Sequence, residues 1–173
     1  LGWGAATLAI VLLQSGAEEV ACRGYLLHAL ARWRGAAAAL VGSSVIFGLL
    51  HGLNPGVTPA ALANTALVGL LLGLIRLRGT LWAAIGFHAA WNFLMGFVLA
   101  QPVSGVRWPG LLATAAEGSP ALTGGEFGLE ASLPLAALIA LAIAGLLIRP
   151  GHARALARLE AESRGEECGP GTS

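Results

Sequence analysis

The sequence contains no lysine, no aspartate and few charged residues of any kind. Its arginines and glutamates make up 11% of the 173 residues, whereas soluble domains carry about 25% charged residues. Hydrophobic residues account for 56% of the chain. A chain of this composition cannot cover its core with a solvated surface, which excludes an ordinary soluble domain and predicts an integral membrane protein. The net charge of +1 gives no reason to expect a nucleic-acid partner.

Several familiar catalytic signatures are also missing. The two cysteines, Cys22 and Cys168, lie far apart and have neither metal-ligand nor disulfide spacing. Cys22 could be a nucleophile, but we favour a small buried apolar residue, because reactive thiolates need a partly exposed, electropositive setting. The chain has no His-Glu-x-x-His sequence, which excludes a zincin, and no Ser/Asp/His set suggests a serine hydrolase.

Five apolar segments predict an all-α, polytopic transmembrane bundle, at about residues 3–31, 36–52, 59–75, 80–100 and 132–148. The first is longer than the about 20 residues that a bilayer core requires, so we expect a bend at Gly16 or Gly24 or a projection beyond the lipid. Residues 101–131 predict a long connecting loop with a short interfacial helix. The membrane domain then covers residues 1–149, and residues 150–173 form a polar tail, a solvated helix with a disordered end.

Arginine clusters predict the orientation of this bundle. They follow the first, third and fifth segments, at Arg32/Arg34, Arg76/Arg78 and Arg149/Arg154/Arg158. With five crossings all three clusters lie on one side, which the positive-inside rule assigns to the cytoplasm together with the C-terminus. We expect a bacterial plasma-membrane protein. Because Leu1 is not an initiator methionine and no charged segment precedes the first apolar segment, we also expect a fragment whose upstream part is missing.

Small residues predict how the helices pack. Gly48/Gly52 and Gly69/Gly73 are Gly-x-x-x-Gly pairs, which let helix backbones approach closely in lipid. Close packing within one chain is the interpretation we favour over a dimerisation motif. The oligomeric state does not follow from the sequence.

Three charged residues interrupt the first apolar segment. Glu19 and Arg23 are four residues apart, so on a helix they share a face and can form an ion pair in the favourable order. Charged groups at membrane depth are costly unless they are paired. Glu18 points about 100° away from Glu19 and has no cation near it in sequence. We therefore expect a structural role for the pair and a chemical role for Glu18, against the alternative that all three only stabilise the bundle.

Two later segments carry further polar residues. His51 ends the second segment four residues after Phe47, and a capping or packing role would explain it in isolation. His88 and Asn92 lie inside the fourth segment and share a helix face, which requires a polar partner or water. Hydrogen bonding between helices alone is the alternative for this pair.

The order Glu18-Glu19-x-x-x-Arg23, Phe47-x-x-x-His51 and His88-x-x-x-Asn92 resembles the three motifs of the CAAX prenyl protease and bacteriocin-processing family, also called the Abi or type II CAAX endopeptidase family. The resemblance covers about residues 10–100 and implies an intramembrane glutamic endopeptidase. It implies that Glu18 activates water with help from His51, and that His88 and Asn92 stabilise the oxyanion. Glu19 and Arg23 would support the first motif, and Phe47 would pack beneath His51.

The resemblance leaves a metal alternative open. Glu18, His51 and His88 could form a zinc site with two histidines and one carboxylate. We favour the metal-free mechanism without a cofactor, because Asn92 is better explained as an oxyanion donor.

Other functions stay open as well. A proton-coupled transporter would use the same residue types but would more often show an internal repeat, and a non-catalytic adaptor or immunity protein would be expected to lack a motif residue. For an endopeptidase, the partners expected are the lipid bilayer and a membrane-associated or CAAX-like peptide or protein substrate.

Overall fold

The computed structural model describes residues 2–112 and 114–166 of the chain. Within them the regular structure is helical, apart from one isolated bridge between Val103 and Val106. The all-α prediction is therefore confirmed. Cys168 and the predicted disordered end of the tail lie outside the described residues.

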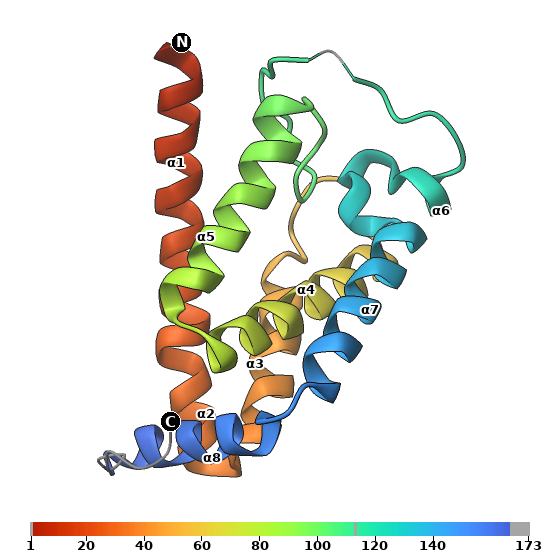
Figure 1. The fold of residues 1–173 in the computed structure, drawn as a ribbon. Helices are drawn as coiled ribbons and strands as arrows, with labels where there is room; N and C mark the ends of the chain where they lie inside the picture. The colour runs from red at the N-terminus through yellow and green to blue at the C-terminus, as the bar shows by residue number, and fades with distance from the viewer. Residues whose placement is uncertain (1, 113, 167–173) are drawn as a thin grey trace.

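The first segment is one continuous helix of 33 residues, from Gly2 to Arg34. It comprises α1 (Gly2–Glu19), the π-helical turn η1 (Val20–Leu26) and α2 (Leu27–Arg34). Figure 1 shows that it runs the full height of the molecule. The π-helical turn follows directly after the two glutamates and includes Gly24, and such widened turns are frequent at functional sites.

Three further helices form the middle of the bundle. α3 (Ala36–Leu50) follows Gly35, which adopts φ +82°, a conformation that favours glycine. α4 (Pro59–Arg78) is capped by the Thr58 hydroxyl, and α5 (Leu81–Asn92) is capped in the same way by Thr80. The π-helical segment η2 (Phe93–Val98) continues α5.

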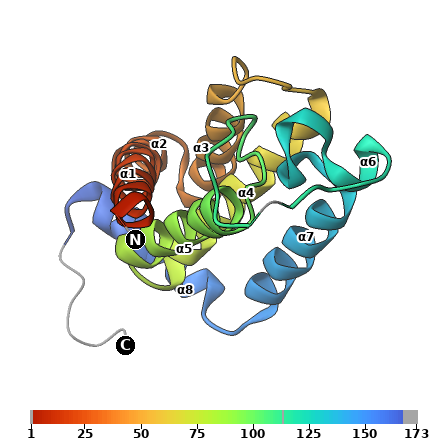
Figure 2. The same ribbon diagram turned by 90° about the horizontal axis from the view of Figure 1, so that it is seen from above.

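The connecting region between η2 and α7 contains three short helices, α6 (Pro120–Thr123), η3 (Gly125–Phe127) and η4 (Leu129–Ala131). The predicted connecting loop with a short helix is thus present. α7 (Leu133–Ile148) begins at a serine cap, and α8 (His152–Arg164) follows it at an angle of 86°. Seen from above, α1 and α7 lie on opposite sides of the bundle, with α3, α4 and α5 between them (Figure 2).

Fewer helices are long enough to cross a bilayer than the five spans predicted. Residues 2–34, 59–78 and 81–98 form helices long and apolar enough to cross a bilayer, and α7 with α8 gives a fourth candidate if the bent pair counts as one span. α3 is apolar but has only 15 residues, because the turn residues that follow His51 end it early. Each predicted segment is helical, and the count of five is approximate. The protein is an integral membrane protein.

Glycines allow α3 and α4 to pack closely. A Cβ atom at Gly48 would lie 2.9 Å from the carbonyl oxygen of Leu62, and one at Gly73 would lie 2.5 Å from the Leu40 side chain. Gly69 faces the backbone of Ser44 in the same contact. These glycines therefore pack helices within the chain, as the sequence indicated.

The tail helix α8 is not simply a solvated helix, because it lies across the ends of α2, α3 and α4 (Figure 1). Its Leu159 is 1% exposed and joins a core cluster that also draws on α2, α3, α4 and α7. Glu160 accepts a hydrogen bond of 2.9 Å from the Ala36 amide, and Arg158 donates one of 2.7 Å to the Leu77 carbonyl. The amphipathic pattern of α8 therefore serves packing as well as solvation.

Candidate active site

A cavity of about 470 Å³ opens between α1, α3, α5 and the connecting region. We call it the polar cavity, because its lining includes Glu18, His51, His88 and Asn92. The structure thus brings the four predicted reactive side chains to one place from three helices. Cys22, Asn54 and Ser104 also line this cavity.

Glu18 reaches the cavity with one carboxylate oxygen free of hydrogen bonds. Gln14 Nε2 donates a hydrogen bond of 3.1 Å to Glu18 Oε1. Among the described residues Glu18 Oε2 has no hydrogen-bond partner, and it lies 3.8 Å from His88 Nε2. The Glu18 side chain as a whole is 29% exposed, whereas Oε2 itself is buried and faces His88.

Glu19 and Arg23 form the predicted ion pair, and both side chains are fully buried. Arg23 donates 2.9 Å to Glu19 Oε1 and 2.8 Å to the Gly69 carbonyl, and its guanidinium lies 4.2 Å from the centre of the Phe47 ring. Two charges removed from water are stabilised only when such partners surround them. The pair therefore joins α1, α3 and α4 around the site.

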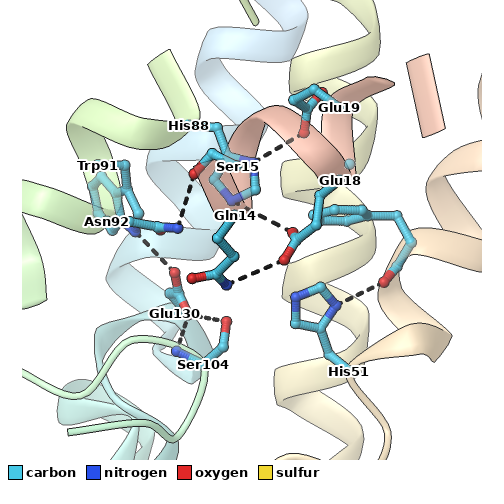
Figure 3. Close-up of polar contacts among 12 residues, drawn as sticks. Gln14, Ser15, Glu18, Glu19, His51, His88, Trp91, Asn92, Ser104 and Glu130 are labelled. Atoms are coloured by element: carbon cyan, nitrogen blue, oxygen red, sulfur yellow. Dashed lines mark hydrogen bonds and ion pairs between the residues drawn. The ribbon is translucent and has the colours of Figure 1, made fainter. Parts of the chain in front are cut away.

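His88 lies between the two adjacent glutamates. Its Nδ1 is 2.9 Å from Glu19 Oε1, so it is a second partner for Glu19 that the spacing of Glu19 and Arg23 did not predict. Since an ionised carboxylate only accepts, Nδ1 carries the proton in this bond and Nε2 faces Glu18. The polar contacts of His88 are thus with α1 (Figure 3).

His51 has a defined tautomer in this structure. Its Nδ1 is 2.8 Å from the carbonyl oxygen of Phe47, which can only accept, so Nδ1 carries a hydrogen. The neutral ring then has its lone pair on Nε2. The Phe47 ring lies 4.9 Å from the His51 ring and 6.0 Å from the His88 ring, so it packs against both histidines.

Asn92 is held by a residue that the sequence reasoning missed. Its Nδ2 donates a hydrogen bond of 3.3 Å to Ser15 Oγ, and both residues are buried. Gln14, which contacts Glu18, is the second residue of the site that the sequence reasoning missed. The spacing of four between Gln14 and Glu18 is a signal that could have found it, whereas Ser15 and Asn92 are 77 residues apart.

A second cavity, lined mainly by apolar side chains, adjoins the first. Phe87, Leu135 and Ile139 contribute to its wall, between α4, α5 and α7. We call it the apolar cavity. It shares His51 and His88 with the polar cavity, so the two cavities meet at the histidines.

The zinc alternative does not fit this arrangement. In the part of the chain that the structure describes, no three His, Cys, Asp or Glu side chains gather closely enough to hold a metal ion. We therefore derive no step through a metal.

Comparison with protein families gives a match over the helices that carry the motifs. The family model described as "Type II CAAX prenyl endopeptidase Rce1-like" matches residues 2–94, more than half of the chain. That range contains every predicted site residue, from Glu18 to Asn92. Searches of curated proteins and of solved structures gave no match.

Proposed function

We propose that this chain, which belongs to the Rce1-like family of type II CAAX prenyl endopeptidases, hydrolyses peptide bonds at the membrane with Glu18 as general base. The family supports a protease. The glutamic mechanism is our inference from the site, and its main support is Glu18, which lines the polar cavity and has a carboxylate oxygen without a hydrogen-bond partner among the described residues, beside His88.

In the proposed reaction, the Glu18 carboxylate takes a proton from a water molecule as the water oxygen bonds to the carbonyl carbon of the peptide. The carbonyl oxygen becomes an oxyanion. When the C–N bond breaks, Glu18 returns the proton to the departing nitrogen, which leaves as an amine. A positioned general base of this kind contributes about 10²–10⁴ in rate.

His51 is proposed to assist Glu18 through its Nε2 lone pair, which the bond from Nδ1 to the Phe47 carbonyl leaves available. His88 and Asn92 are proposed to donate to the oxyanion. An imidazolium at His88 would also balance the charges, because the site then has two carboxylates and two cations, the second being Arg23. Removal of one such donor typically costs about 10²–10³ in turnover.

The proposed substrate is a membrane-associated or CAAX-like peptide. The family description supports this class, and the apolar cavity beside the histidines suits an apolar group next to the scissile bond. The described lining of the polar cavity contains no arginine, so recognition of the peptide by an ion pair with its C-terminal carboxylate is not proposed.

A Glu18→Gln variant tests the function. Peptides from the membranes of cells that carry wild-type protein or Glu18→Gln are compared by mass spectrometry, together with cleavage of a farnesylated CAAX peptide by the purified proteins. Glu117→Gln, which changes an exposed carboxylate in the connecting region, is the control. We expect products that depend on Glu18 but not on Glu117; equal cleavage by all three proteins would falsify the proposal.

The metal-free mechanism has its own test. Purified protein is dialysed against a strong chelator and its metal content is measured by elemental analysis. We expect full cleavage without bound zinc. Loss of activity that only zinc restores would contradict the metal-free mechanism and leave the protease function intact.

We also propose that the arginine-rich end of the bundle faces the cytoplasm of a bacterium. Arg34, Arg78 and Arg149 lie at the ends of α2, α4 and α7, where α8 crosses the bundle. A tag at the C-terminus should resist protease in sealed right-side-out membranes, and digestion of the tag would reverse the proposed orientation.

A further inference from the structure

The connecting region contains a buried carboxylate that lies outside all three motifs. Glu130 is 8% exposed. Its Oε1 accepts a hydrogen bond of 2.9 Å from Trp91 Nε1, and its Oε2 accepts bonds of 2.6 Å and 2.7 Å from the amide and hydroxyl of Ser104 (Figure 3). Three neutral donors thus hold this carboxylate. It ties the end of the connecting region to α5 and to the segment around Ser104.

Ser104 lies in a tight turn from Val103 to Val106, which we call the 103–106 turn. Two backbone hydrogen bonds of 2.9 Å close the turn between Val103 and Val106. Ser104 has φ +47° and Gly105 has φ +81°. A positive φ is uncommon for a residue other than glycine and persists when the surroundings hold it. The two hydrogen bonds that Ser104 donates to Glu130 stabilise this backbone conformation.

The same turn packs against the loop that follows His51. Asn54 Nδ2 donates a hydrogen bond of 2.9 Å to the Ser104 carbonyl. A Cβ atom at Gly105 would overlap the Pro55 carbonyl oxygen, so the two backbones are in close contact. Gly105 also donates 2.9 Å to the Phe127 carbonyl. The turn is therefore fixed between the α3–α4 loop and the segment before Glu130.

Ser104 also lies where the polar cavity and the apolar cavity meet. The linings of the polar and apolar cavities share four residues, Phe47, His51, His88 and Ser104. The first three belong to the motifs on α3 and α5. Ser104 is the one shared residue that comes from the connecting region.

We propose that Glu130 is a positioning residue of the endopeptidase, which holds Ser104 at the junction of the polar and apolar cavities. This proposal rests on the proposed function. Glu130 lines the apolar cavity together with Ser104, and it is not among the described residues that line the polar cavity, where the reaction is proposed. Through the 103–106 turn, Glu130 fixes the position of the polar cavity relative to the apolar cavity. A substrate can then place its peptide bond at Glu18 while its neighbouring apolar group lies in the apolar cavity.

The variants Glu130→Gln and Ser104→Ala test this role with the farnesylated CAAX peptide. In Glu130→Gln the amide side chain would present one acceptor oxygen where the carboxylate has two, so it cannot satisfy both Trp91 and Ser104. We expect KM to rise about tenfold to a hundredfold with a smaller change in kcat, since a displaced cavity junction weakens the binding of substrate and transition state alike. Ser104→Ala removes one donor and should give a smaller rise in KM.

Glu126→Gln is the matched control, because Glu126 is an exposed carboxylate in the same region. It should keep the wild-type KM. A purely structural role of Glu130 would lower the amount of folded enzyme and thus the apparent kcat of Glu130→Gln and Ser104→Ala, without a rise in KM.

A second readout needs no substrate. Cys22 lines the polar cavity, so its rate of modification by a maleimide reports how closed that cavity is. In a Cys168→Ser background, release of the turn by Glu130→Gln or Ser104→Ala should raise the rate above that of Glu126→Gln. Ser104→Ala retains the carboxylate and all backbone bonds, so it serves if Glu130→Gln does not fold.

The outcomes separate this proposal from the function on which it rests. Glu18→Gln decides the protease function alone. If Glu18→Gln is inactive while Glu130→Gln and Ser104→Ala match Glu126→Gln in KM and in Cys22 labelling, the positioning role is overturned and the function stands. If peptide cleavage does not depend on Glu18, the function fails, and unchanged Cys22 labelling would also overturn the positioning role.

Discussion

Two regions of this molecule each bury a carboxylate, and they stabilise it in different ways. In the motif-bearing helices, Glu19 is fully buried and faces a guanidinium and an imidazole, those of Arg23 and His88. In the connecting region, Glu130 is satisfied by an indole, an amide and a hydroxyl, with no cation among its described hydrogen-bond partners.

The difference indicates what each carboxylate does. A charge pair inside a bundle is costly to break, because the remaining charge has no partner, so Glu19 supports the fold around the site. Glu130 accepts hydrogen bonds from neutral donors, and each of these bonds is weaker than the buried ion pair of Glu19. Such bonds suit a segment that must be positioned at the junction of the polar and apolar cavities, and Glu130 links the connecting region to α5.

The largest effect should follow from breaking the ion pair. Arg23→Met leaves Glu19 buried without its guanidinium, and we expect the free energy of unfolding to fall by about 3–5 kcal/mol. Denaturant titration of the protein in detergent micelles measures this change. The double variant Glu19→Gln/Arg23→Met should recover part of the loss, because no charge is then left unpaired. A double variant that is less stable than the single one would contradict the ion-pair argument.

A smaller effect should come from the connecting region. Gly105→Ala places a Cβ atom against the Pro55 carbonyl and at φ +81°, so both overpacking and backbone strain oppose it. We expect a loss of about 2–3 kcal/mol in the same titration. Gly16→Ala, at a helix position with no heavy atom within 4 Å, is the control and should not destabilise. Equal stability of the two variants would show that the turn is not held in place.

The smallest effect should come from one donor to Glu130. Trp91→Phe removes the indole N–H and keeps an aromatic ring, leaving the two bonds from Ser104. We expect a loss of about 1.5 kcal/mol, the lower end of the range for a hydrogen bond to a charged group. A loss as large as that of Arg23→Met would remove the distinction between the two regions.

The helical fold could be predicted from local patterns, and the residues of the candidate site were proposed from the order of three motifs. Apolar runs located the five helical segments, and spacing of four predicted the pairing of Glu19 with Arg23. Both signals act within one helix. The span count was less accurate, because α3 with 15 residues and α7 with 16 residues are each shorter than a helix that crosses a bilayer.

Contacts between residues far apart in the sequence could not be predicted. Glu130 meets Ser104 across 26 residues and Trp91 across 39, and the 103–106 turn gave no signal in a stretch that read as loop. The second partner of Glu19, His88, is 69 residues away. Similarly, the lone pair of His51 could be assigned only once its Nδ1 was found at the Phe47 carbonyl. Such contacts follow from the packing of helices rather than from sequence spacing.

The most direct test of the central claim compares the two adjacent glutamates in one preparation. The turnover of the farnesylated CAAX peptide and the unfolding free energy are measured for Glu18→Gln and Glu19→Gln. The account predicts that Glu18→Gln loses turnover by about 10²–10⁴ at unchanged stability, and that Glu19→Gln is destabilised while its folded fraction still cleaves. An active Glu18→Gln protein beside a stable, inactive Glu19→Gln protein would contradict it.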